Sequence, residues 1–461
     1  MTGNPVSASA PVSARVPSRA PARVPLQPTI ISAASPALFG ASLTALRQLL
    51  AGEISILPLP ADWHRTCPDL PHHMRAGSSL DADMVAPGTL IACTSGSTGT
   101  PKGAVLGSRQ LTFSADATAS FIERHFKALP GAWLLTLPAH HIAGIQVSLR
   151  SLRAGYTPLA AEHLRDGAHF SAAGFIADTE ALAEKYPGVP LYTSLVPTQL
   201  DRLADEPAAV QALTRYACVL VGGAAARGGV VKKMAEAGAK IALTYGSSEN
   251  AGGMVYNGHC LPGARVQISD ADERGVGRVR IAGPMVADGY RNVDSAEAFP
   301  AAGEFLTSDI GVLDGDVLRI LGRADGAINT GGYKVLPEEV EKALCQSVPG
   351  AEAAFAAGIE DPQYAEFGES IGVLVVLKDG AVRATASDTT ASDTTAPDIT
   401  EMVRTAMRGQ AKPELLPRRA WVISEMPTTG PGKIDRRQAA ELLRGMVQES
   451  AQKAKPLRGL E

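Results

Sequence analysis

A chain of 461 residues, 45% hydrophobic and 20% charged, is long enough for at least two domains and has the balance of an ordinary globular protein. Its formal net charge of −4 is not the charge balance of a polyanion binder, which argues against a nucleic-acid partner. No segment approaches the roughly 20 uninterrupted apolar residues of a membrane span. The five cysteines stand singly, without the spacing of a zinc site. We expect a cytoplasmic protein with no nucleic-acid partner and no membrane span.

Two low-complexity segments frame the folded chain. Residues 1–28 consist mostly of Ala, Pro, Ser and Val, with too few large apolar side chains to fold, which predicts a disordered tail. Residues 381–399 contain two copies of Ala-Ser-Asp-Thr-Thr and are interpreted as a surface insert, because lengthening a surface loop costs little free energy. We therefore expect the fold to begin near Thr29.

Short Val/Ile/Leu runs then alternate with Ala-rich amphipathic stretches. The pattern predicts a helix over residues 108–125, with Ser108 as its N-cap, and a second over 197–204. Alternating strands and helices favour an α/β domain with a substantially parallel sheet. The predicted strands cover residues 90–93, 133–137, 191–196, 217–221 and 240–244.

The pattern changes after residue 260 to short β-type segments with Gly turns, which predicts a β subdomain that closes the large domain. After Arg323 the elements suggest a small α+β domain. We expect a large N-terminal domain over residues 29–323 and a small mobile C-terminal domain over 324–450. The small domain is predicted to contain helices at 337–344 and 399–408 and strands at 353–357, 371–377 and 420–424.

The most informative segment is Thr94-Ser-Gly-Ser-Thr-Gly-Thr-Pro-Lys-Gly103, directly after a predicted strand. Its backbone N–H groups and hydroxyls can bind phosphate oxygens, and Lys102 adds a positive charge. The segment does not match the nucleotide-binding loop that ends in Gly-Lys-Ser/Thr, because Pro101 and Gly103 occupy positions reserved for other residues.

Further segments place polar side chains at expected strand ends and turns. Tyr245-Gly-Ser-Ser-Glu249 follows a predicted strand, where open α/β sheets bind ligands. Tyr245 could stack on a base, and Glu249 could help to hold a hard cation. Asp309 and Arg323 suit ribose hydroxyls. Lys433, on a Gly/Pro turn, could deliver one charge to a reacting phosphate.

Together and in this order, these segments resemble the adenylate-forming superfamily of acyl-CoA ligases, peptide-synthetase adenylation domains and luciferases. The resemblance covers roughly residues 85–440 and implies that fold, with ATP, Mg²⁺ and coenzyme A as small-molecule partners beside an acid. It implies catalytic roles for Lys433, Ser248 and Glu249, with Glu249 as the metal ligand, and a hinge at Asp325 with a CoA loop at Gly331 and Gly332. The ATP-binding positions it implies are Thr94, Ser95, Gly96, Ser97, Thr98, Gly99, Lys102, Gly222, Gly223, Ala224, Tyr245, Gly246, Asp309 and Arg323.

The acid is suggested by a narrower resemblance. Residues 137–146 and 193–200 are similar to the matching segments of actinobacterial o-succinylbenzoate–CoA ligases of menaquinone biosynthesis. A dicarboxylate with an aromatic ring needs polar donors around an apolar slot. The donors available here are His141, Gln146, Ser194 and Gln199. His140 and His141 could equally be one buried structural histidine and one exposed histidine.

Three other interpretations remain open. A peptide-synthetase adenylation domain would load a carrier protein, and another aryl- or fatty-acyl-CoA ligase would use a different acid. A degenerate nucleotide-binding protein of the same fold would bind ATP without turnover. A homodimer is compatible with the sequence.

Overall fold

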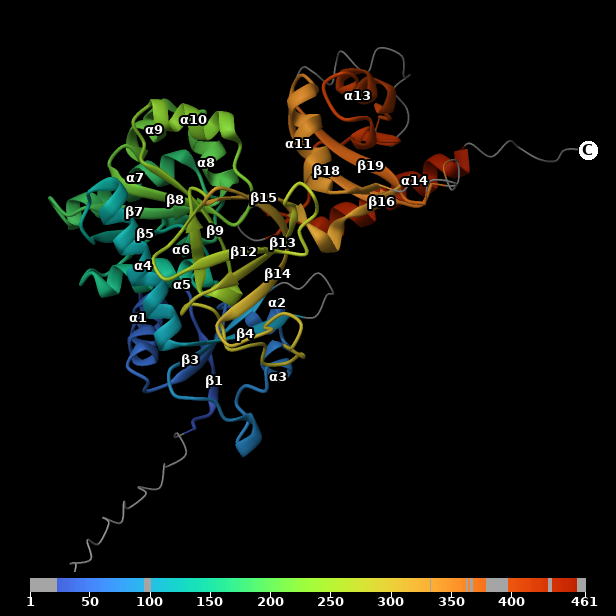
Figure 1. Cartoon of the computed structure of the whole chain (residues 1–461). Helices are drawn as coiled ribbons and strands as arrows, with labels where there is room; N and C mark the ends of the chain where they lie inside the picture. Colours follow the sequence, from blue (N-terminus) through green and yellow to red (C-terminus); the bar gives the residue numbers. More distant parts are fainter. Residues whose placement is uncertain are drawn as a thin grey trace, which may run out of the picture.

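The computed structural model describes residues 23–94, 101–331, 333–361, 364, 368–378, 397–429 and 433–453. Figure 1 shows a larger body that contains the elements up to β15 and a smaller group of elements, from β16 to α14, at its upper right. No helix in these ranges is both long enough and apolar enough to cross a bilayer.

The first sheet contains strands β1 (Leu26–Ile30), β2 (Ser55–Leu59), β3 (Thr89–Thr94) and β4 (Lys102–Gly107), in that order. The first three run parallel, and β4 returns antiparallel to β3 with Thr94 opposite Lys102. Helix α1 (Pro36–Leu50) covers this sheet and begins after Ser35, whose hydroxyl accepts the backbone N–H of Leu38. Three short elements link β2 to β3, namely α2 (Trp63–Thr66), α3 (Leu70–His73) and η1 (Asp81–Asp83).

The folded chain begins earlier than the composition predicts. Leu26 is buried in β1, which starts at this residue, so residues 26–28 belong to the sheet, and Val24 forms an isolated bridge with Val85 just before it. Pro28 favours a tail in the sequence because proline is rare inside strands. It is tolerated here because β1 is an edge strand. The part of the predicted tail before residue 23 lies outside the described residues.

The central sheet has the strand order β11-β10-β9-β8-β7-β5-β6. Every pair from β9 to β6 is parallel, while β10 and β11 add an antiparallel edge, so the expected parallel sheet is present. Its strands are β5 (Ala132–Leu135), β6 (Leu159–Ala160), β7 (Leu191–Leu195), β8 (Tyr216–Gly222), β9 (Ile241–Ser247), β10 (Gly252–Tyr256) and β11 (His259–Cys260).

Helices cover both faces of the central sheet. Because strand side chains alternate between faces, Tyr192 joins one hydrophobic cluster and Leu191 the other. Helices α4 (Ser108–Phe126) and α5 (Ile142–Arg153) pack in the first cluster. The opposite face carries α7 (Ala172–Lys185), α8 (Pro197–Ala204), α9 (Pro207–Leu213) and α10 (Gly228–Glu236), while α6 (Glu162–Asp166) connects β6 to α7.

The predicted helix over 108–125 is present as α4, but its N-cap is Gly107 and not Ser108. The side-chain oxygen of Gln110 accepts the backbone N–H of Gly107 at 3.1 Å. This bond fixes the helix start one residue earlier than the hydroxyl of Ser108 suggests, because a glutamine at the third helical position can close the first turn from within.

A third sheet has four antiparallel strands, β12 (Arg265–Ser269), β13 (Gly277–Ala282), β14 (Glu304–Asp314) and β15 (Val317–Arg323). The chain between β13 and β14 crosses to the first sheet. There Tyr290 forms a bridge with Ala104, and the N–H of Val105 donates to the carbonyl of Gly289 at 2.9 Å. The closing β subdomain is therefore joined to β4, the strand at the end of the segment 94–103, which is called the phosphate-loop segment below.

The C-terminal elements form a sheet in the order β18-β19-β20, with β19 antiparallel to β18 and parallel to β20. Helices α11 and α13 pack in one hydrophobic cluster of this sheet and α14 in another. The elements are η3 (Ala324–Gly326), β16 (Ile328–Thr330), β17 (Tyr333–Val335), α11 (Pro337–Ser347), β18 (Ala351–Ile359), β19 (Ser370–Leu377), α13 (Thr400–Met407), η5 (Pro413–Leu415), β20 (Arg419–Val422), β21 (Thr428–Thr429), β22 (Lys433–Ile434) and α14 (Arg436–Lys453).

These two C-terminal clusters use side chains from Ile328 onward only, which supports the expected small domain, although the exact division at residue 323 remains a prediction. The predicted insert, residues 381–399, ends earlier than expected. Ile399 is buried, and its N–H donates to Ala420, so residues 397–399 belong to the folded part. Residues 379–396 lie outside the described residues.

Candidate active site

Most candidate residues gather at one edge of the central sheet. Ser194 lies near the end of β7, Gly222 ends β8, and Tyr245 lies near the end of β9. Carboxyl ends of parallel strands meet at a common edge, which is where such sheets bind ligands. The 3₁₀ turn η2 (Ser248–Asn250) follows β9 and contacts both β3 and β4, so Ser248 lies beside the strands that hold Thr94 and Lys102. Candidates Ser95, Gly96, Ser97, Thr98 and Gly99 lie outside the described residues.

A chain of charged and polar groups crosses from the central sheet to the third sheet. The hydroxyl of Tyr245 donates to Asp309 Oδ2 at 2.6 Å, and Arg323 Nη1 donates to Asp309 Oδ1 at 3.3 Å. Strand pairing places Asp309 opposite Arg323, and Arg323 also binds Asp325 at 2.6 Å. The hydrogen bond with Asp325 raises the pKa of Arg323, so its guanidinium stays charged. This arrangement can hold a diol such as ribose.

The phenol of Tyr245 remains neutral in this chain. Burial raises the pKa of Tyr245, and the nearby Asp309 carboxylate raises it further because it repels a phenolate. The hydroxyl therefore remains a hydrogen-bond donor over the whole working pH range. The carboxylate of Asp309 is held in one orientation.

A second polar group joins η2 to the first sheet. Glu249, 7% exposed, accepts a hydrogen bond from the hydroxyl of Tyr290 at 2.9 Å. Lys102 Nζ lies 5.3 Å from the centre of the Tyr290 ring. Burial, followed by the Glu249 carboxylate, raises the pKa of Tyr290, which keeps it a donor. Tyr290 thus holds an acidic and a basic side chain at the same edge, a setting suited to a polyphosphate with its metal ion.

Two candidate glycines are required by close approaches of strands. A Cβ at Gly222 would lie 2.1 Å from Thr244 Oγ1, and one at Gly246 would lie 1.7 Å from the carbonyl oxygen of Gly252. Both positions therefore admit only glycine if β8, β9 and β10 keep their spacing. Gly223 and Ala224 are exposed after the end of β8, at the edge where Tyr245 lies.

Two adjacent histidines precede α5. The rings of His140 and His141 lie 4.3 Å apart between centroids. Burial, with a smaller contribution from His141, lowers the pKa of His140 to about 3, so His140 is neutral at physiological pH. His140 is the more buried of the two, and His141 is exposed as the N-cap of α5. His141 is thus the histidine that a ligand can reach.

The four expected acid-binding donors come from α5 and its N-cap, from β7 and from α8. Gln146 on α5 donates to the carbonyl of Leu111 at 3.2 Å, and its side-chain oxygen has no partner among the described residues. Gln199 belongs to α8, whose apolar residues pack against the opposite face of the central sheet from α5. Its side-chain N–H donates to the Thr136 carbonyl at 3.1 Å, and its side-chain oxygen accepts the N–H of Val196 at 3.0 Å. Gln199 therefore braces the start of α8, and its expected role as a donor to the acid stays a prediction.

Ser194 remains at the site edge. Its side chain is half-buried near the end of β7, and its backbone carbonyl accepts the hydroxyl of Thr136 at 2.5 Å. Thr136 thus joins the ends of β5 and β7 and positions Ser194 relative to the histidines that follow β5.

The C-terminal candidates lie on two separate hairpins. Gly331 joins β16 to β17 with a φ of +55°, a left-handed conformation that glycine adopts without strain. Lys433 begins β22, and its backbone lies opposite Thr429. Gly332 and the side chain of Lys433 lie outside the description. Asp325 lies in η3, between the third sheet and these hairpins.

Sequence reasoning missed Tyr290 and Asn292. Asn292 accepts the N–H of Gly103 at 3.0 Å and donates to the carbonyl of Pro101 at 2.8 Å, so it fixes the chain where β4 begins. The only local signal was the run Gly289-Tyr-Arg-Asn292, which has no periodicity and lies far along the chain from the phosphate-loop segment.

Comparison with known proteins gives a consistent result. A family model described as AMP-binding enzyme matches residues 81–291. The chain is 34% identical over 413 residues to a probable 2-succinylbenzoate–CoA ligase of Mycobacterium tuberculosis (strain H37Rv), which covers 89% of this chain and 96% of the relative. It is 28% identical to a 2-succinylbenzoate–CoA ligase of Geobacillus kaustophilus, covering 77% of this chain and 69% of the relative.

Solved structures share the fold at lower identity. The o-succinylbenzoate coenzyme A synthetase of Bacillus subtilis, in complex with ATP and magnesium, matches with a TM-score of 0.66 and 20% identity, covering 90% of each chain. An amide bond synthetase of Marinactinospora thermotolerans matches with a TM-score of 0.67 and 22% identity, covering 91% of this chain and 90% of that one. The adenylate-forming fold expected from the sequence is confirmed.

Proposed function

Because the chain belongs to the AMP-binding enzyme family, we propose that it is an AMP-forming acid–CoA ligase that activates 2-succinylbenzoate, also called o-succinylbenzoate, for menaquinone biosynthesis. The observation that carries the proposal is the meeting of two groups at one sheet edge. Tyr245, Asp309 and Arg323 are suited to a nucleoside, while Glu249 and Lys102, joined by Tyr290, are suited to its phosphates.

The reaction has two steps. In the first, an oxygen of the acid's carboxylate forms a bond to the α-phosphorus of ATP, the bond to the bridging oxygen breaks, and pyrophosphate leaves. In the second, the thiolate of coenzyme A attacks the acyl carbon of the mixed anhydride, and AMP leaves with the bonding electrons. The thiol proton passes to solvent. Catalysis in both steps depends on positioning and on charge stabilisation.

We assign the nucleoside to the exposed end of β8 and to Tyr245. The loop Gly222, Gly223 and Ala224 presents backbone beside Tyr245, whose ring offers a surface on which adenine can stack. Asp309 would accept hydrogen bonds from the ribose hydroxyls, and Arg323 would donate to them. The hydrogen bond from Tyr245 orients Asp309 for this task, because it leaves one carboxylate oxygen facing Arg323.

The phosphates would lie between Thr94, Lys102 and Ser248, with the proposed magnesium ion on Glu249. The residues fit such an ion: Glu249 Oε1 accepts from Tyr290, and no contact of Oε2 is seen within the described ranges, so Oε2 is available to ligate. Magnesium is typically held by one or two carboxylates plus substrate phosphates. When bound, it neutralises charge on the phosphates.

The acid would bind near the start of α5. His141 is exposed at the N-cap of this helix, and the buried side-chain oxygen of Gln146, further along α5, has no partner within the part of the chain that the structure describes. Ser194 lies on the neighbouring strand β7. The donors His141 and Ser194, with the neutral ring of His140 beside His141, suit a substrate with a second carboxylate and an aromatic ring. The side-chain oxygen of Gln146 can only accept a hydrogen bond. Gln199 contributes by bracing Thr136.

The two C-terminal hairpins would act in turn. We assign the charge that stabilises the adenylation transition state to Lys433, and the wall of the coenzyme A channel to Gly331 and Gly332. Both hairpins belong to the small group of elements that follows Asp325 (Figure 1), so rotation at Asp325 would exchange one for the other. A reaction that consumes ATP and coenzyme A would take place in the cytoplasm.

The experiment that tests the proposal is magnesium-dependent ATP–pyrophosphate exchange with a panel of acids, repeated with coenzyme A and detection of the thioester. The panel contains 2-succinylbenzoate, benzoate, a medium-chain fatty acid and several amino acids. We expect exchange and thioester only with 2-succinylbenzoate.

Each other outcome has a defined meaning. Thioester from a different acid would retain the chemistry and discard the substrate. Exchange with an amino acid, without thioester on free coenzyme A, would favour an adenylation domain that loads a carrier protein. ATP binding without exchange for any acid would identify a nucleotide-binding protein that has lost turnover.

A further inference from the structure

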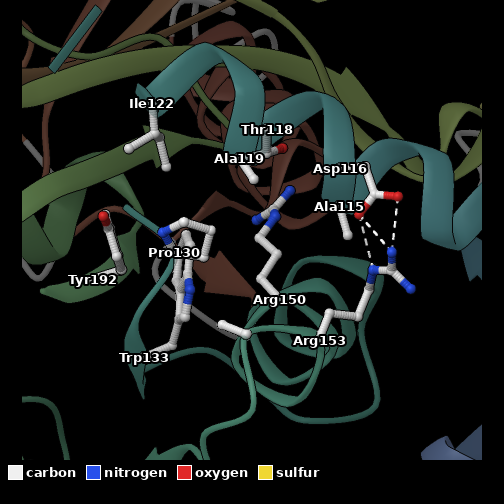
Figure 2. A pocket seen from close by; sticks show the side chains of 11 residues that line it. Ala115, Asp116, Thr118, Ala119, Ile122, Pro130, Trp133, Arg150, Arg153 and Tyr192 are labelled. Atoms are coloured by element: carbon white, nitrogen blue, oxygen red, sulfur yellow. Dashed lines mark hydrogen bonds and ion pairs between the residues drawn. The ribbon is translucent and has the colours of Figure 1, made fainter. Parts of the chain in front are cut away.

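A small cavity of about 90 Å³ lies between helices α4 and α5, away from the candidate active site. Figure 2 shows the side chain of Arg150 in its middle, with Trp133 and Tyr192 on one side and the pair Asp116 and Arg153 on the other. The remaining lining residues are small or apolar and include Ala115, Ala119, Ile122, Pro130 and Ala154.

Arg150 is a buried cation with no counter-ion among the described residues. Its side chain belongs to a residue that is only 8% exposed, and no described carboxylate lies within ion-pair distance of it. Its one described hydrogen bond runs from Nη2 to the hydroxyl of Tyr256 at 3.4 Å, and its Nε has no partner in the described part of the chain. The Trp133 ring lies 5.4 Å from the guanidinium carbon. Burial of a charge with so little compensation is costly.

The acid at the rim of this cavity does not supply the missing charge. Asp116 on α4 is held by Arg153, whose Nε and Nη2 donate to it at 2.7 to 2.9 Å (Figure 2). This pair is neutral as a unit, so Arg150 leaves one net positive charge in the cavity. A bound anion would balance this charge and accept the N–H groups that Arg150 offers.

The cavity is separate from the ATP and acid sites. Trp133 lies near the amino end of β5, whereas the candidate active site lies at the carboxyl ends of the strands. His141 caps the start of α5, and Arg150 comes nine residues later, so the rise of an α-helix separates them by roughly 14 Å. No residue assigned above to ATP, to magnesium or to the acid lines the cavity.

We propose that this cavity is a second binding site, for a small monoanion with an apolar body, such as an aromatic monocarboxylate. The carboxylate would bind the guanidinium of Arg150, and the ring would lie against Trp133 and Tyr192. The size of the cavity restricts the ligand to about one ring, and the neutral Asp116–Arg153 pair favours one negative charge over two.

The test uses the full-length protein, calorimetry and three matched probes. Benzoate has both a charge and a ring, acetate has the charge alone, and benzyl alcohol has the ring alone. We expect benzoate to bind at least tenfold more tightly than either of the other probes. Arg150→Met should abolish this preference, while Arg124→Met, an exposed arginine on α4 that does not line the cavity, should leave it unchanged.

A second variant guards against misfolding and against binding in the acid pocket. Ala119→Phe fills the cavity from α4 and keeps Arg150, and it should also abolish benzoate binding. Thermal unfolding checks that both variants fold. Because Arg150→Met removes an uncompensated buried charge, its melting temperature should not be lower than that of the wild type. Wild-type benzoate affinity in both cavity variants, or no benzoate binding to the wild type, would overturn the proposal. Both outcomes are independent of which acid forms a thioester.

Discussion

At the scale of single residues, the hydroxyl of Tyr245 connects two sheets through Asp309. Tyr245→Phe removes a hydrogen bond to a charged group, so we expect the KM for ATP to rise about tenfold. The cause is loss of orientation of Asp309, and the acid's KM should change little. Pyrophosphate exchange at varied ATP measures this effect. Tyr186→Phe, which removes a tyrosine hydroxyl bonded to Thr157 far from the site, is the control and should behave as the wild type.

The low pKa of His140 leads to a second prediction at this scale, which concerns how the free energy of unfolding depends on pH. Because its pKa falls from 6.5 to about 3 in the folded chain, the unfolded chain binds the extra proton between these values. Stability is therefore fully present above pH 6.5 and is lost as the pH falls toward 3, by at most about 1.4 kcal/mol per pH unit. His140→Gln should make the loss shallower.

Urea unfolding of this variant at several pH values gives the slope of the free energy of unfolding against pH. The exposed His73→Gln serves as control and should keep the wild-type slope. An unchanged slope in His140→Gln would show that this imidazole is not what destabilises the protein in acid.

At the scale of elements, one arginine joins two C-terminal helices. Arg436, which begins α14, binds Glu341 of α11 at 2.9 Å and Glu338 at 3.3 Å. Glu341 is largely buried, so Arg436→Met should destabilise the protein by about 2 kcal/mol, because a buried carboxylate loses its partner. Glu341→Met combined with Arg436→Met should recover most of this loss. Thermal unfolding of the two single variants and the double variant gives the coupling free energy.

The adjacent pair Arg437–Glu441 is the matched control. It has the same chemistry at 3.1 Å, but both side chains are exposed. Arg437→Met should therefore change stability by less than about 0.5 kcal/mol. Equal effects of the two arginine substitutions would mean that burial of Glu341 contributes nothing.

Most elements follow from local pattern alone. The predicted helix over 197–204 is observed with the same bounds as α8, because proline at the first position and apolar spacing are both local signals. The start of the fold was predicted too late, because the composition up to Pro28 is typical of a disordered tail. Only the pairing of β1 with β2 shows that a strand begins there.

At the scale of the whole molecule, the two C-terminal hairpins predict separable half-reactions. Lys433→Ala should suppress adenylation at least a hundredfold, because one charge at the transition state is lost, and should leave thioester formation from supplied acyl-AMP nearly unchanged. Single-turnover assays of each half-reaction make the comparison. Lys412→Ala, an exposed lysine of the same C-terminal part, is the control. Equal loss in both half-reactions would contradict the alternation of hairpins.

The sequence by itself picked out the segment 94–103, the segment 245–249, Asp309 and Arg323 as candidates, because glycine-rich and hydroxyl-rich runs and single charged residues can be recognised from local sequence alone. Only the tertiary structure decided which of them meet. Tyr290 reaches Glu249 from the connection between β13 and β14, and the helices that carry Gln146 and Gln199 pack on opposite faces of the central sheet. The physical reason is that strand order and helix side follow from long-range burial of apolar surface, which no local pattern records.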